Sequence, residues 1–120
     1  MPLQDILIIG LLNNKKRGGL GPELWPYPPY VYNGTEANAQ IVESANILVV
    51  GRTYRTSLTE IGPNTGGTTR ALIGNQVLVG AENDTVTSDL IPATTLARWQ
   101  ALGTPPFEGT VTLSIKEVIN

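Results

Sequence analysis

The spacing of prolines between residues 13 and 32 constrains this chain more than any other feature of its sequence. Four of the nine prolines lie in this segment, together with three of the four tyrosines and one of the two tryptophans. No helix can run through it, because each proline removes an amide donor and clashes with the preceding turn. The residue before each proline is also held in an extended conformation. The sequence therefore predicts an extended, aromatic-rich arm with polyproline-II character.

We expect the arm to comprise residues 1–34 and to precede a β-rich domain of residues 35–120. Its aromatic side chains allow three roles. They are a grip on a partner protein, where Tyr and Trp are enriched at hot spots, a cover for the chain's own sheet, and a stacking platform for a carbohydrate or a base. The sequence leaves these roles open. The candidate partner-binding residues are the basic and large side chains of the arm: Lys15, Lys16, Arg17, Leu24, Trp25, Tyr27, Tyr30 and Tyr32.

An apolar run at residues 6–12 precedes the basic residues of the arm. It is too short to cross a bilayer, so we expect no membrane partner. Because Gly10 interrupts it and the basic residues follow it, it does not have the pattern of a signal peptide. Residues 3–12 fit either a strand of the domain or a part of the arm.

Strand patterns dominate the rest of the chain. We expect a long strand at Asn46–Leu58, a hairpin at residues 69–79 and a closing strand at Thr110–Ile119. Gly74-Asn75 suits a type II′ turn, which places Leu72 opposite Val77 and Ala71 opposite Leu78.

Two segments have helical patterns. Residues 35–44 allow one or two helical turns, with Thr35 as the N-cap. A short helix is predicted at about residues 92–102, where Leu96, Trp99 and Leu102 recur at helical spacing after Pro92. The fold class is thus mainly β, a small β-sandwich or barrel-like domain with one short helix and an N-terminal arm.

The absence of cysteine and histidine excludes several chemistries. A Ser-His-Asp triad, a Cys-His pair and a histidine-based metal site all need these residues. Carboxylate pairs, Glu82 with Asp84 and Glu108 with Glu117, are the remaining basis for catalysis. The acidic stretch from Glu82 to Asp89 lacks the pattern of a helical calcium loop. We therefore expect no enzyme, no catalytic residues, no cofactor and no metal.

The charge of the chain indicates which kinds of partner it can bind. The net charge is −2, which disfavours binding of nucleic acid by bulk electrostatics. Only 15% of residues are charged, and a weakly charged surface resists self-association poorly. A basic group at residues 15–17 and an acidic group at Glu82, Asp84 and Asp89 have opposite signs. These groups can meet between identical copies, or each can remain solvated.

A small Cys- and His-free β domain with a Pro-aromatic arm resembles the structural proteins of tailed-bacteriophage virions, in particular capsid cement or decoration proteins. The arm NNKKRGGLGPELWPYPPYVY and the short-strand pattern from Asn46 to Val79 carry this resemblance. It implies a non-enzymatic protein of the virion, assembled in the host cytoplasm, that binds between major capsid subunits, stabilises the shell and self-associates in the assembly. The alternatives are a tail, neck or fibre component and, in a different class, a carbohydrate-binding β-sandwich module.

Overall fold

The computed structural model describes residues 19–35, 40–44, 46–63, 66–103 and 105–119. These residues form nine strands and no helix, which confirms the mainly β prediction. The strands are β1 (Gly19–Glu23), β2 (Tyr30–Asn33), β3 (Gln40–Ser44), β4 (Tyr54–Ile61), β5 (Thr68–Ile73), β6 (Gln76–Val79), β7 (Thr85–Leu90), β8 (Ala97–Leu102) and β9 (Glu108–Ile119). Residues 3–12, whose place in the arm or the domain was open, lie outside the described residues.

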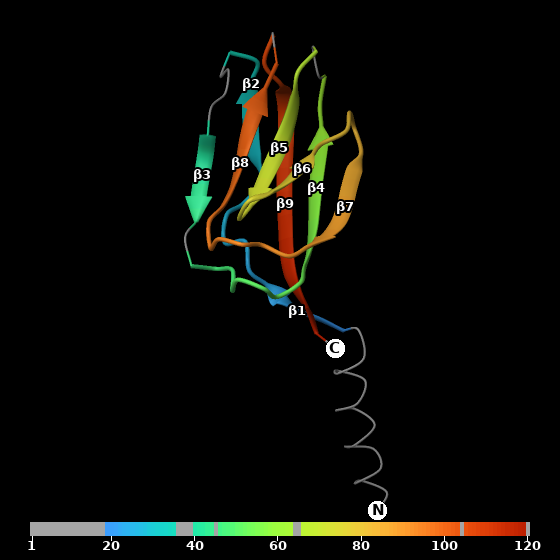
Figure 1. Ribbon diagram of the computed structural model, residues 1–120. Coiled ribbons are helices and arrows are strands. Elements are labelled where there is room, and N and C mark those ends of the chain that lie inside the picture. Colours follow the sequence, from blue (N-terminus) through green and yellow to red (C-terminus); the bar gives the residue numbers. More distant parts are fainter. Residues whose placement is uncertain (1–18, 36–39, 45, 64–65, 104, 120) are drawn as a thin grey trace, which may run out of the picture.

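The strands form two antiparallel sheets that face each other (Figure 1). The five-stranded sheet has the order β1-β9-β4-β7, and β2 also pairs with β9. The four-stranded sheet has the order β3-β8-β5-β6. Buried side chains from both sheets make one hydrophobic core, as expected of a β-sandwich.

The long strand β9 shows why these residues form strands. Val111, Leu113 and Ile115 are buried, whereas Thr112 and Ser114 point to the outer face. This alternation has the period of two that a half-buried strand requires. The predicted closing strand is therefore confirmed, with its inward phase.

The hairpin of β5 and β6 is also confirmed, including its register. Leu72 pairs with Val77 and Ala71 with Leu78. Gly74 has a φ of 62°, the conformation that a primed hairpin turn needs at its first central residue. A Cβ at Gly74 would lie 2.6 Å from Pro92 Cβ, so the turn also needs glycine for space.

The helix predicted at about residues 92–102 is wrong, because this segment contains strand β8. Ala97, Trp99 and Ala101 are buried, and the residues between them are half-buried on the other face. Trp99 fits both a period of two with the alanines and a period of three with Leu96 and Leu102. Alanine has low β-propensity, so the sequence favours the second pattern. The structure has the first pattern, because the small alanine side chains are buried between the sheets.

Two further expectations need correction. The strand predicted at Asn46–Leu58 begins only at Tyr54, as β4. Asn46 and Gly51 have φ values of 68° and 89°, and this left-handed conformation interrupts a strand before Tyr54. The helical turns expected at residues 35–44 are replaced over the described part by strand β3.

Candidate interaction surface

The described part of the predicted arm is extended, as expected, but it belongs to the five-stranded sheet. β1 and β2 pair with opposite ends of β9, along the edge that β4 does not occupy. At the end of β1, the Glu23 side chain bonds the next residues of β9. Its Oε2 accepts the Ile115 N–H at 2.7 Å, and its Oε1 accepts the Ser114 hydroxyl at 2.6 Å. From Gly19 onward, residues 1–34 are thus not an arm separate from the domain.

Two aromatic residues of this segment lie in the core. Trp25 is 4% exposed and Tyr32 is 1% exposed. The Trp25 ring lies 5.3 Å from the Trp99 ring, and the Tyr32 ring meets the Phe107 ring at 6.1 Å. Of the three roles considered for the aromatic set, these two side chains therefore cover the protein's own sheets.

The other candidate residues do not form one surface. Tyr27 is 41% exposed and packs edge-on against Trp25. Leu24 and Tyr30 are half-buried and pack against the core. The basic group at residues 15–17 (Lys15, Lys16 and Arg17) lies outside the described residues. Among the described candidates, Tyr27 alone presents a large, well-exposed ring.

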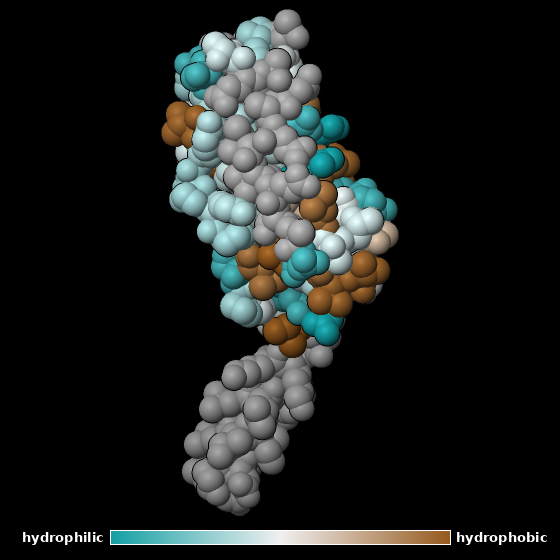
Figure 2. Space-filling view, turned by 90° about the vertical axis from the view of Figure 1, so that its left-hand side faces the viewer, coloured by the Kyte–Doolittle hydropathy of each residue, from teal (hydrophilic) through white to brown (hydrophobic). Residues whose placement is uncertain are grey.

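Exposed aliphatic side chains gather instead at the end of the sandwich that holds β1 and the end of β9. We call this surface the apolar end. Its members are Leu20, Val49, Val50, Ile91 and Ile119, each between 37% and 55% exposed. Leu20 and Ile119 lie on the paired strands β1 and β9, and the other three lie on the β3–β4 and β7–β8 connections at the same end (Figure 1). Figure 2 shows hydrophobic side chains concentrated in this lower half of the sandwich.

The loops that carry the apolar end are held by hydrogen bonds. The buried Tyr54 hydroxyl accepts the Val49 N–H at 2.7 Å. The Gly51 N–H donates to the Pro92 carbonyl at 3.1 Å, which joins the two connections next to Val50 and Ile91. The apolar side chains are therefore presented from anchored backbone, so little ordering is needed when a partner covers them.

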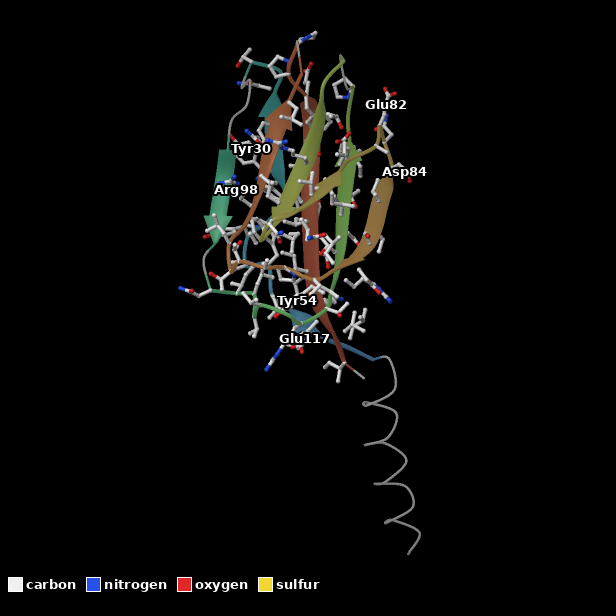
Figure 3. All side chains as sticks on the ribbon, in the orientation of Figure 1. Tyr30, Tyr54, Glu82, Asp84, Arg98 and Glu117 are labelled. Atoms are coloured by element: carbon white, nitrogen blue, oxygen red, sulfur yellow. The ribbon has the colours of Figure 1, made fainter. Side chains whose placement is uncertain are left out.

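Ion pairs lie beside the apolar end. Arg52 Nη1 is 3.4 Å from Glu117 Oε1, and Figure 3 shows Glu117 near Tyr54 at this end. Arg55 binds Asp89 with two hydrogen bonds of 2.8 and 2.9 Å. These bonds lower the pKa of Asp89, and the charge of Arg55 adds to the effect while partial desolvation opposes it. The same hydrogen bonds raise the pKa of Arg55.

The outer face of the five-stranded sheet contrasts with the apolar end. Ser57 and Thr87 hydroxyls lie 2.9 Å apart, and Thr59 and Thr85 hydroxyls lie 2.8 Å apart. These pairs link β4 to β7 across a polar face. That face is not wholly polar, because Val31 on β2 and Ile61 on β4 are 66% and 62% exposed there. Exposed apolar side chains thus gather at the apolar end without being confined to it.

The carboxylates considered for catalysis do not converge. Glu108 and Glu117 lie nine residues apart on the one strand β9, which separates them by about 30 Å. Glu82 and Asp84 lie in the turn before β7 and point outward (Figure 3). No group of three acidic residues suited to a metal ion occurs within the part of the chain that the structure describes.

A buried carboxylate, Glu60, was not among the candidate residues expected from the sequence. Glu60 is fully buried, and its Oε2 accepts hydrogen bonds from Thr69 N at 2.7 Å, Thr69 Oγ1 at 2.7 Å and Thr68 Oγ1 at 2.8 Å. The alternation of Tyr54, Thr56 and Leu58 along β4 was the signal that assigns Glu60 to the inner face. Glu60 ties β4 to β5 across the sandwich.

The apolar end was missed for a related reason. Val49 and Val50 have the apolar pattern of a buried central strand, whereas they lie on a surface loop.

No family model, curated protein or solved structure matches this chain. Over the described residues, no helix has the length and apolar content needed to cross a membrane.

Proposed function

We propose that this protein is a non-enzymatic structural component of a virus particle, of the capsid cement or decoration kind. It binds between major capsid subunits through the apolar end and stabilises the shell. Its place is the virion, assembled in the host cytoplasm, and its partners are proteins rather than nucleic acid or membrane. The observation that carries the proposal is the set of exposed aliphatic side chains on anchored loops at one end of the sandwich.

The energy of such a contact suits a repetitive assembly. The five side chains are each 37–55% exposed, and burying what remains yields about 1 kcal/mol apiece, hence about 5 kcal/mol in total. That gain is similar to the lower values for the entropic cost of bringing two proteins together. One contact alone is therefore weak, and a shell that offers many neighbouring sites supplies the avidity.

The carbohydrate-binding alternative loses support from the burial of Trp25 and Tyr32. A stacking platform needs exposed ring faces, and Tyr27 is the one well-exposed ring among the described candidates. A tail, neck or fibre component remains the second candidate, because such assemblies use the same kind of apolar contact with a different symmetry.

The test is co-sedimentation with empty shells of the major capsid protein from the same virus. The wild-type protein is expected to pellet with shells at a fixed ratio to the shell subunits. A V50S/I91S variant, which changes two exposed side chains of the apolar end, is expected to bind at least about tenfold more weakly. A V77S/V79S variant, which changes the exposed valines of β6, serves as the matched control and is expected to bind as wild type. Absence of shell binding by the wild-type protein would refute the proposal.

A further inference from the structure

Among the strands of the described residues, β7 is an open edge of the five-stranded sheet, since its one neighbour there is β4. The Glu60 N–H donates to the Asp84 carbonyl at 3.0 Å, which makes Thr59 and Thr85 a non-hydrogen-bonded pair. The pairs alternate along an antiparallel ladder, so the main-chain groups of Thr87 and Asp89 point away from β4 as well. This edge can accept a further strand.

The turn before β7 is acidic and exposed. Glu82 and Asp84 point outward at this corner of the sandwich (Figure 3). Asp84 Oδ1 accepts the Thr85 N–H at 2.7 Å, which fixes the start of the strand. The two ion pairs of the described residues join Arg52 to Glu117 and Arg55 to Asp89, so neither uses a carboxylate of this turn.

The sequence before β1 has the complementary pattern. An apolar run at residues 6–12 is followed, after two asparagines, by a basic group at residues 15–17. If the run pairs antiparallel with β7, it passes from Leu90 toward Thr85, and the basic group then continues to Glu82 and Asp84. Alternate side chains of the run would cover Val86 and Leu90, which are half-buried at the edge of the core.

One copy cannot make this arrangement with its own segment. Gly19 pairs with Ile119 at one end of β9, whereas the acidic turn lies beside Glu60, which pairs with Val111. The eight residues from Val111 to Ile119 span about 27 Å, and the spacings between β9, β4 and β7 add about 10 Å sideways. Lys15 is four residues from Gly19 and so lies at most about 14 Å from it.

A segment can reach β7 of its own copy only in the parallel direction. The basic group would then lie at the end of β7 opposite to the acidic turn, and the charge complementarity would be lost. A second copy has no such restriction, because its segment can approach the edge from either end. Geometry and charge together therefore favour an antiparallel contact between copies.

We propose that residues 6–17 of one copy add as an antiparallel strand to β7 of a second copy, with the basic group on Glu82 and Asp84. Each copy offers one segment and one edge, so the contact is head-to-tail and builds a ring or an open chain. This inference goes beyond the proposed function, since it names a second copy as a partner and requires no capsid protein.

The test is sedimentation velocity of the full chain over a range of protein and salt concentrations. The wild-type protein is expected to associate as its concentration rises, and less so at high salt. Segment variant K15E/K16E and turn variant E82K/D84N are each expected to associate at least about tenfold more weakly. The D84N change keeps a side-chain oxygen that can accept the Thr85 N–H, so the turn variant changes charge rather than local structure. Variant E108K, on β9 at the same end of the sheet but separated from β7 by β4, is the control and should match wild type.

An experiment with mixed variants distinguishes a loss of charge pairing from a general loss of structure. An equimolar mixture of K15E/K16E with E82K/D84N restores opposite signs at every contact between the two variants and is expected to recover association. An I8P variant removes an amide from the added strand and is expected to weaken association without any change of charge. A wild-type chain that stays monomeric at all concentrations, or a mixture that stays as weak as its components, overturns the inference. Neither result bears on the proposed binding to the capsid shell, which the comparison of wild type with V50S/I91S tests separately.

Discussion

Trp25 packs on Trp99 inside the sandwich, with ring centroids 5.3 Å apart and ring planes inclined by 51°. Trp25 follows β1 of the five-stranded sheet, and Trp99 is the central buried residue of β8 in the four-stranded sheet. The contact therefore joins the N-terminal part of the described chain to the opposite layer. The proline-rich segment closes the core instead of extending away from it.

Replacement of Trp25 is predicted to destabilise the fold. W25A removes a buried indole and leaves a cavity against Trp99, which typically costs about 3–5 kcal/mol of unfolding free energy. Y27A, two residues away, is the control, because its ring is 41% exposed and its loss should cost less than about 1 kcal/mol. Urea unfolding followed by tryptophan fluorescence measures both. Equal losses in the two variants would contradict the placement of Trp25 in the core.

Glu60 is predicted to be needed for the contact between β4 and β5. E60A leaves three donors, on Thr68 and Thr69, without their buried acceptor, and we expect a loss of about 3 kcal/mol. E60Q keeps an acceptor oxygen and should lose less. The exposed Glu82 provides the control, as E82A changes a solvated side chain. Chemical denaturation measures the unfolding free energy, which should decrease in the order E82A, E60Q, E60A. An E60A variant as stable as wild type would contradict this prediction.

A comparison of alanine substitutions at two glycines with left-handed backbone distinguishes conformational strain from steric clash. Gly51 has a φ of 89° with no atom within 4 Å of its missing Cβ, so G51A should cost about 1–2 kcal/mol from the backbone alone. Gly74 has a φ of 62°, and its Cβ would lie 2.6 Å from Pro92 Cβ and 2.7 Å from the Thr94 carbonyl oxygen. G74A should therefore lower the melting temperature markedly more than G51A. Similar melting temperatures for the two variants would argue against the tight packing of the hairpin turn.

The Arg55–Asp89 pair predicts a specific pH dependence. Hydrogen bonds from Arg55 lower the pKa of Asp89 in the folded state. The stabilisation is therefore present above the unfolded pKa of about 4 and is lost as the pH falls through the lower folded value. The difference in unfolding free energy between wild type and D89N should be small at neutral pH, because the pair is exposed, and should shrink toward zero as the pH falls below the folded pKa of Asp89. A difference that persists unchanged at low pH would show that Asp89 acts by some other means.

Local patterns were sufficient where one turn or one alternation determined the structure. The hairpin register followed from Gly74-Asn75, and the inward phase of β9 followed from the alternation of Val111, Leu113 and Ile115. Both signals lie within a dozen residues, so they do not depend on distant parts of the chain.

The features that the sequence did not predict depend on contacts between distant parts of the chain. Ala97 and Ala101 have little strand preference of their own, and they lie in β8 because the space between the sheets accepts small side chains there. The destination of Trp25 was open for the same reason, since its partner Trp99 lies 74 residues further along the chain. The apolar end combines two connections and two strand ends, and no local pattern indicates such a surface.

The most direct test of the central claim is photocrosslinking in assembled particles. A photoreactive residue in place of Val50, at the apolar end, is compared with one in place of Thr87, on the polar face of β7. The account predicts crosslinks from position 50 to the major capsid protein and few from position 87 to that partner. Particles that contain no copy of this protein, or equal crosslinking from both positions, would contradict it.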